Sequence, residues 1–140
     1  VKQMIYEIGE LQGFIPVKEP RLERFRIDVV WKAVPRGHPH YAFEVQIGGN
    51  VIEALTKLKH AYDIWHSDPF LITTEEQEAE AEELIEGAFH EIRDVIRILG
   101  WKKIKELYET KHKLSALELE LGIIPRRRQA IQSEKRGIEA

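Results

Sequence analysis

The chain has 140 residues, of which 43% are hydrophobic, which is enough for one hydrophobic core but too little for two. Its net charge of −3 excludes a general attraction to nucleic acid, so a nucleic-acid partner would require a local basic patch or a bound metal. The absence of cysteine excludes disulfides and thiolate metal sites, and no apolar run reaches the roughly 18 residues of a membrane span. We therefore expect a soluble, cytoplasmic protein with no membrane partner. The high Lys and Glu content and the single methionine are typical of proteins from thermophiles.

The first half of the chain predicts one helix, a three-stranded meander, a second helix and a further strand. Apolar periodicity predicts the helices, and β-branched and aromatic runs predict the strands. The expected segments are a helix over 3–12, strands over 14–17, 24–32 and 41–47, a helix over 51–66 and a strand over 70–74. Because a helical crossover precedes it, the last strand should lie parallel to the strand before that helix. The chain starts without a methionine, at the beginning of what looks like a helix, which leaves open that it is a piece of a longer protein.

The second half of the sequence reads as helical. Glu, Gln and Ala dominate residues 75–86 and predict a solvated helix, after which amphipathic helices are expected over 89–99 and 104–121. Leu107, Leu114 and Leu121 are spaced by seven, which permits a coiled-coil seam and a homodimer; the alternative is a helix that packs on its own domain. We therefore divide the chain into an α/β domain over 1–100, a C-terminal helix with a possible dimer contact over 101–124, and a basic flexible tail over 125–140.

Two acids and an amide stand in the apolar strands. Asp28 lies within RIDVVW, and Glu44 and Gln46 lie two residues apart in YAFEVQI. Neighbouring strands are about 4.8 Å apart and residues i and i+2 share a face, so these side chains can converge. Two carboxylates that meet repel each other, and a hard divalent metal would offset this repulsion and could activate water against a phosphodiester. The alternatives are that Asp28 faces solvent or pairs with a neighbouring Arg or Lys, and that Glu44 and Gln46 belong to a polar outer face.

The order of elements around these residues resembles the PD-(D/E)xK nuclease superfamily, which includes many restriction endonucleases and archaeal Holliday-junction resolvases. The resemblance covers about residues 3–74 and consists of a glutamate-bearing first helix, Gly13-Phe14, Asp28, Glu44-x-Gln46, and a helix before the fourth strand. It implies a restriction-endonuclease-like α/β fold, with a mixed sheet of about four strands in an α-β-β-β-α-β core and a C-terminal helical extension. The implied activity is hydrolysis of phosphodiester bonds in DNA, dependent on Mg²⁺ or Mn²⁺.

The resemblance also assigns roles to individual residues. Asp28, Glu44 and the backbone carbonyl of Val45 would bind the metal, and Gln46 would position the attacking water. Glu7 would be an auxiliary ligand, with Glu10 as the alternative for the helix-one acid.

Gln46 departs from the family pattern because it occupies the place usually held by lysine. A lysine would supply a positive charge there, whereas glutamine can only form hydrogen bonds. Lys57 and Lys59 on the next expected helix could supply this charge, or they could be ordinary surface lysines. A second hypothesis is therefore a catalytically inactive nuclease-fold module for DNA binding or dimerisation. A third is an unrelated α/β fold in which Asp28 and Glu44 lie far apart.

The remaining motifs have simpler interpretations. His38 and His40 are interpreted as part of an exposed turn, Tyr62 and Trp65 as core residues, and the run Arg126 to Arg128 as a solvated tail. No base-reading element is recognisable, so duplex, branched and single-stranded DNA all stay open as substrates.

Overall fold

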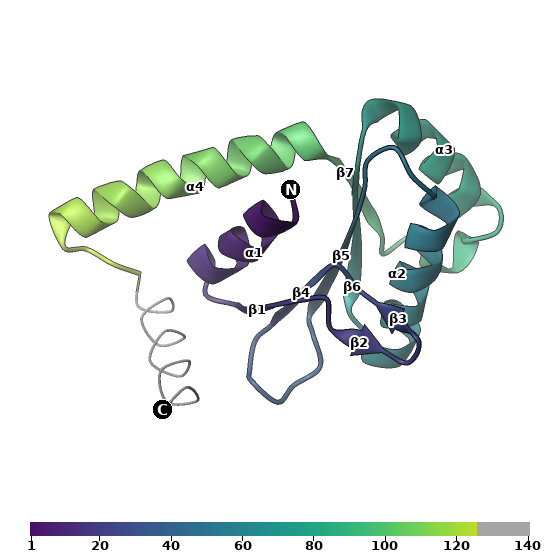
Figure 1. Cartoon of the computed structure of the whole chain (residues 1–140), viewed down its shortest axis with the longest axis horizontal. Helices are drawn as coiled ribbons and strands as arrows, with labels where there is room; N and C mark the ends of the chain where they lie inside the picture. Colours follow the sequence, from purple (N-terminus) through teal and green to yellow (C-terminus); the bar gives the residue numbers. More distant parts are fainter. Residues whose placement is uncertain (126–140) are drawn as a thin grey trace.

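A computed structural model describes residues 1–125, and within this range the chain forms a five-stranded mixed sheet flanked by helices (Figure 1). The strand order is β1-β4-β5-β6-β7. These strands are β1 (Ile15–Lys18), β4 (Val29–Lys32), β5 (Tyr41–Gln46), β6 (Asp68–Thr73) and β7 (Arg97–Gly100). The first three are antiparallel neighbours, whereas β5, β6 and β7 run parallel. The expected α/β class, the meander and the parallel crossover into β6 are thus confirmed.

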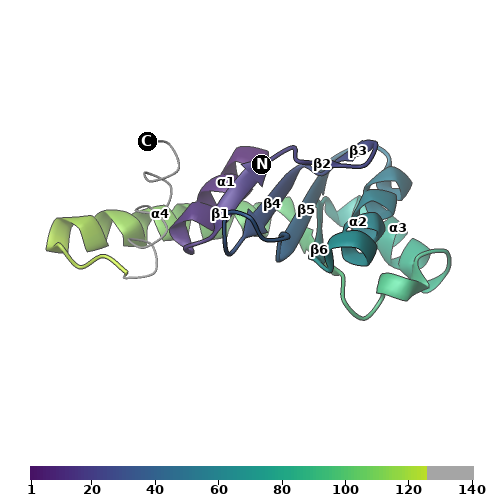
Figure 2. The ribbon, with the colours of Figure 1, turned by 90° about the horizontal axis from the view of Figure 1, so that it is seen from below.

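Helices cover both faces of the sheet (Figures 1 and 2). The helices α1 (Lys2–Leu11) and α4 (Trp101–Leu121) lie on one face, and α2 (Val51–Trp65) and α3 (Glu75–Glu86) lie on the other. The strands alternate accordingly: Val29 and Phe43 pack in the cluster under α1 and α4, whereas Val30 and Ala42 pack in the cluster under α2 and α3. Strand β6 contributes to both clusters, as expected for a strand buried on both faces.

The strand expected over 24–32 is interrupted. Its first part, β3 (Phe25–Arg26), pairs with β2 (Arg21–Leu22) in a short separate hairpin, and only β4 joins the main sheet. Glu19 and Glu23 adopt positive φ values, which turn the chain on either side of β2. Asp28 therefore lies at the point where the chain leaves the hairpin and enters the sheet.

The prediction of a helix over residues 89–99 is wrong. A 3₁₀ turn, η1 (His90–Ile92), is followed by β7, whose residues Arg97 to Gly100 pair with Phe70 to Thr73 of β6. Short apolar runs fit both periodicities, and here the open edge of β6 decides because pairing satisfies its backbone groups. The sheet consequently has five strands rather than about four.

Close packing fixes α1 over the sheet. The indole of Trp31 in β4 lies against Gly9, where an added Cβ would come within 2.5 Å of the indole nitrogen. The same nitrogen donates a hydrogen bond to the carbonyl oxygen of Ile5 at 3.1 Å. Only glycine allows this approach, and the resulting position of α1 brings Lys2 to Asp28, next to the first residue of β4.

Helix α4 packs on its own domain through Ile104 and Tyr108, which join the cluster formed with α1. Leu107, Leu114 and Leu121 remain exposed. None of the helices between residues 1 and 125 combines the length and apolar character that a bilayer span requires. The arginine run over 126–128 and nearly all of the expected tail lie outside the described residues.

Candidate functional site

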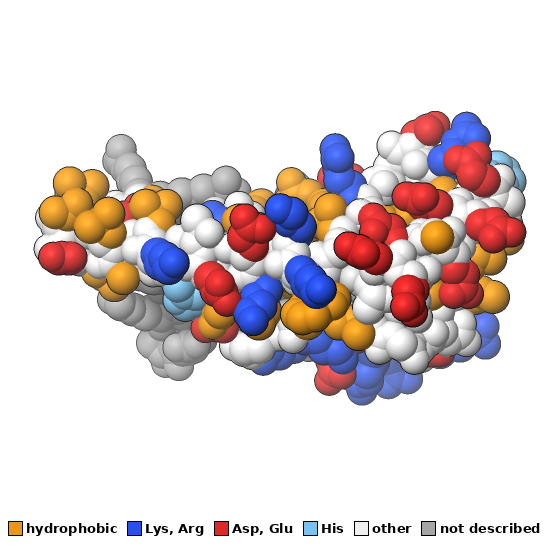
Figure 3. Space-filling view, turned by 90° about the horizontal axis from the view of Figure 1, so that it is seen from above, with side chains coloured by type: hydrophobic (Ala, Val, Ile, Leu, Met, Phe, Trp, Pro, Cys, Tyr) orange, Lys and Arg blue, Asp and Glu red, His pale blue; other side chains and the backbone are white. Residues whose placement is uncertain are grey.

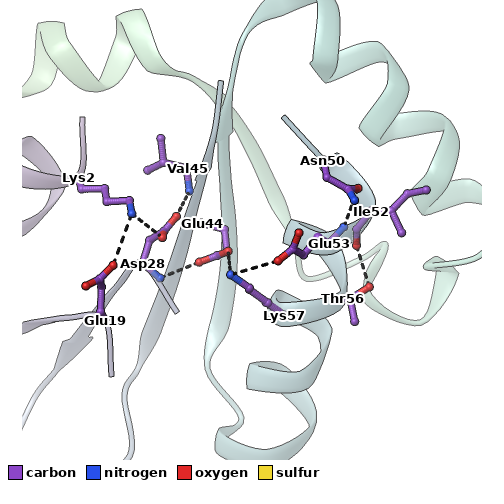
Figure 4. Close-up of polar contacts among 10 residues, drawn as sticks. All are labelled: Lys2, Glu19, Asp28, Glu44, Val45, Asn50, Ile52, Glu53, Thr56 and Lys57. Carbon is purple, nitrogen blue, oxygen red and sulfur yellow. Dashed lines mark hydrogen bonds and ion pairs between the residues drawn. The ribbon is translucent and has the colours of Figure 1, made fainter. Parts of the chain in front are cut away.

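Asp28 and Glu44 meet at the junction of β4 and β5 (Figure 4). Val29 pairs with Phe43 in the antiparallel register, so one step outward places Asp28 opposite Glu44. The backbone N–H of Asp28 donates to Glu44 Oε2 at 2.7 Å, and the backbone N–H of Val45 donates to Asp28 Oδ2 at 2.8 Å. Each carboxylate thus accepts a hydrogen bond from the opposite strand, which fixes both side chains. Asp28 and Glu44 thus converge as their spacing predicts, whereas Gln46, which was expected to join them, contacts the loop before α2.

Two lysines approach this acid pair from helices on opposite sides of the sheet (Figure 4). Lys2 Nζ of α1 lies 2.9 Å from Asp28 Oδ1, and Lys57 Nζ of α2 lies 3.4 Å from Glu44 Oε1. The Lys2 side chain is 48% exposed, whereas that of Lys57 is only 20% exposed. Lys57 is therefore a fixed part of the site, whereas the Lys2 side chain is the more exposed and the more readily displaced, although Asp28 itself is only 14% exposed.

Glu44 is the buried member of the pair. Burial raises its pKa, and the negative charge of Asp28 raises it further, to about 7. The hydrogen bond from the Asp28 backbone and the charge of Lys57 oppose this shift without cancelling it. Ionisation of Glu44 beside the charged Asp28 is costly, and an additional cation next to the two carboxylates would lower this cost.

The donor set fits a hard divalent cation. Asp28 and Glu44 provide carboxylate oxygens, and the carbonyl of Val45 points to the same side of β5 as its N–H, which faces Asp28. Mg²⁺ is commonly held by one or two carboxylates and completes its coordination with water and phosphate oxygens. No group of three or more His, Asp or Glu side chains in residues 1–125 is arranged to hold a metal, so the carbonyl and water would have to complete the coordination.

The Gln46 amide contacts the loop before α2. Its amide oxygen accepts hydrogen bonds from the backbone N–H groups of Gly49 at 3.2 Å and Asn50 at 3.0 Å. A Cβ at Gly49 would overlap the Gln46 amide, so the glycine is required for this contact. Asn50 in turn caps α2 by accepting from the backbone N–H of Glu53 at 3.1 Å. Gln46 therefore holds the start of the helix that carries Lys57.

Glu7 faces α4 instead of the acid pair. It forms a hydrogen bond with Tyr108, which raises the pKa of that phenol, and its carboxylate lies 3.8 Å from His112 Nε2. Glu7 is five residues beyond Lys2, which is roughly 140° further round the helix. Because Lys2 points to Asp28, Glu7 cannot point there as well. Lys2 is the α1 residue that reaches the site, and no sequence pattern predicts it.

The other sequence candidates lie elsewhere. Lys59 pairs with Asp63 at 2.7 Å and with Glu91 at 3.1 Å. Tyr62 and Trp65 pack against the buried cluster under α2, as the core interpretation expects. Of the two lysines that could supply the missing charge, Lys57 alone contacts an acid of the pair.

Comparison of this chain with protein-family models, with curated proteins and with solved structures finds no match.

Proposed function

We propose that this protein is a Mg²⁺- or Mn²⁺-dependent DNA endonuclease with a restriction-endonuclease-like core. The observation that carries the proposal is the meeting of Asp28 and Glu44 at one corner of the sheet, with Lys57 beside Glu44. The order α1, β1, β4, β5, α2 and β6 supports it, because this is the order that the resemblance to PD-(D/E)xK nucleases implies.

Each residue of the site has a defined task in this proposal. Asp28, Glu44 and the Val45 carbonyl hold the cation, which when bound lowers the pKa of a water molecule and neutralises charge on the scissile phosphate. Lys57 supplies the fixed positive charge that a lysine at position 46 would otherwise provide. Gln46 acts indirectly, by fixing the first turn of the helix on which Lys57 lies.

The hairpin beside the site carries three exposed arginines around Glu23, which pairs with His60, and this excess of positive charge supports DNA as the substrate. The β2–β3 hairpin leads directly into Asp28 and exposes Arg21, Arg24 and Arg26. Arg21 and Arg26 donate to backbone carbonyl oxygens of the hairpin, and the Arg24 guanidinium lies 5.4 Å from the ring centre of Phe25. Arginines held in this way can contact phosphates. Because the chain has a net charge of −3, such local positive charge is needed for it to bind DNA.

Lys57→Ala is expected to reduce Mn²⁺-dependent cleavage by about 10²- to 10³-fold, because a fixed charge at a developing oxyanion contributes about that much. Lys59→Ala is the matched control, since Lys59 lies two residues away on the same helix and pairs with other acids. The measurement is single-turnover cleavage of a labelled DNA duplex. Equal activity of the two variants would contradict the role of Lys57.

Lys2→Ala is expected to tighten Mn²⁺ binding by up to about fivefold, because it removes a competing cation from Asp28 Oδ1. Isothermal titration without DNA measures this effect apart from catalysis. Lys18→Ala is the control, because the Lys18 ammonium contacts Gln3 and the ring of Tyr6 instead. Weaker Mn²⁺ binding in Lys2→Ala would show that Lys2 supports the metal site instead of competing with it.

A catalytically inactive nuclease-fold module that binds DNA is the second candidate. It is favoured by the orientation of Gln46 and by the two lysines, which balance the charge of both acids without a metal. DNA binding that is unaffected by Mn²⁺, together with no Mn²⁺ binding by the purified chain, would select this candidate over the enzyme.

A further inference from the structure

Helix α4 carries two apolar stripes, and among residues 1–125 only one of them packs on the rest of the domain. Ile104 and Tyr108 pack against the cluster under α1. A second stripe stays exposed, with relative exposures of 41% for Leu107, 53% for Leu114, 50% for Leu117 and 62% for Leu121. Figure 3 shows hydrophobic side chains gathered toward the C-terminal end of α4, at the left.

The exposed stripe has the spacing of a coiled-coil seam. Leu107, Thr110, Leu114, Leu117 and Leu121 follow one another by alternating steps of three and four residues, as a and d positions do. Leu114 lies roughly 80° round the helix from Ile104, so the seam can be covered while α4 stays packed on its own domain. Figures 1 and 2 show that the second half of α4 extends past α1.

The charges beside the seam are self-complementary for an antiparallel pair. When Leu114 of one helix lies against Leu117 of another, Thr110 lies against Leu121. The flanking positions then bring Lys111 beside Glu118 and Lys113 beside Glu120, and two-fold symmetry repeats both pairs. Opposed helix dipoles add to this attraction.

A parallel pair fits the helix less well. It would bring the first halves of both helices together, and these carry five lysines and two glutamates over residues 102–113. It would also crowd both domains at one end, whereas the antiparallel pair places them at opposite ends.

We propose that a second copy of this chain covers the exposed seam, so that two α4 helices form an antiparallel, two-fold symmetric pair. The proposal rests on α4 alone and is independent of the nuclease activity. Packing on α1 already orders the helix, so pairing does not require the helix to fold first.

Sedimentation velocity of the full chain between about 1 and 100 μM tests whether it self-associates. We expect a concentration-dependent dimer, and Leu114→Glu should weaken it at least about tenfold. Leu119→Glu is the matched control, because Leu119 is 62% exposed on the same helix but lies off the seam. A monomer throughout this range, or a dimer that survives Leu114→Glu, would overturn the proposal.

Disulfide formation tests the antiparallel register, because the chain contains no cysteine of its own. Thr110→Cys mixed with Leu121→Cys should form a cross-linked dimer on mild oxidation. Thr110→Cys alone should not, because two copies of residue 110 would lie about 11 residues apart along the pair, or roughly 16 Å. A disulfide needs Cα atoms within about 7 Å. Cross-linking of Thr110→Cys with itself and not with Leu121→Cys would show a parallel pair and overturn the proposed register.

Discussion

Asp28→Asn is expected to reduce Mn²⁺-dependent DNA cleavage by about a thousandfold or more while leaving the fold intact. The substitution removes the charge that binds the cation, and a bound metal contributes several kcal/mol to the transition state of such reactions. The amide oxygen of asparagine can still accept the hydrogen bond from the Val45 N–H, now made to Asp28 Oδ2 at 2.8 Å. Asp28→Ala should lose cleavage equally but also lose about 1 kcal/mol of stability, because it leaves that N–H without its partner.

Single-turnover cleavage and urea unfolding of the same preparations measure both effects. Asp63→Asn is the matched control, because Asp63 lies on α2 and pairs with Lys59 at 2.7 Å instead of joining the site. Cleavage by Asp28→Asn at the rate of the unaltered chain would remove Asp28 from the proposed mechanism.

Glu44→Gln is expected to stabilise the fold relative to the unaltered chain as the pH rises, while abolishing metal-dependent cleavage. The pKa of Glu44 is raised from 4.5 to about 7 in the folded chain by burial and by the charge of Asp28. Between these values the folded state binds more protons than the unfolded state, so stability falls as the pH rises through this window. This shift in the pKa of Glu44 corresponds to a loss of about 3 kcal/mol of folding stability at most. A glutamine at position 44 stays neutral, so the variant does not lose this stability.

Urea unfolding at pH 5 and at pH 8 checks this prediction. The difference in unfolding free energy between Glu44→Gln and the unaltered chain should grow by about 2 to 3 kcal/mol across that interval. Glu109→Gln is the control for loss of an exposed charge, since the Glu109 side chain is 56% exposed. At pH 8, Mn²⁺ should stabilise the unaltered chain but not Glu44→Gln, because only the former binds it tightly. Parallel stability curves for Glu44→Gln and the unaltered chain would contradict the proposed ionisation of Glu44.

Most of the fold follows from local sequence patterns, and the exceptions depend on contacts that are distant in sequence. Apolar periodicity and the turn residues between the elements predict the three-stranded meander, α2 and the parallel strand β6. Strand β7 could not be predicted in this way, because the apolar residues Ile98 and Leu99 fit the pattern of a helix as well as that of a strand. Its conformation is decided by pairing with β6, which lies almost thirty residues earlier in the chain.

The acid pair was predictable from the sequence, but its surroundings were not. Strand register and side-chain alternation suffice to bring Asp28 and Glu44 together. The contact of Lys2 with Asp28 depends on the placement of α1 by Gly9 and Trp31, which no local pattern reveals. Gln46 turns toward α2 because Gly49 leaves space for its amide, and the sequence Gly48-Gly49-Asn50 was the only available signal.

The central claim is that Asp28 and Glu44 hold a divalent cation. A crystal of the unaltered chain soaked in Mn²⁺ at pH 8, measured for anomalous scattering, tests this claim most directly. We expect an anomalous peak bonded to carboxylate oxygens of Asp28 and Glu44 and to the carbonyl of Val45, with Lys2 displaced from Asp28. The absence of an anomalous peak at this position, or Mn²⁺ bound only to other residues, would contradict it.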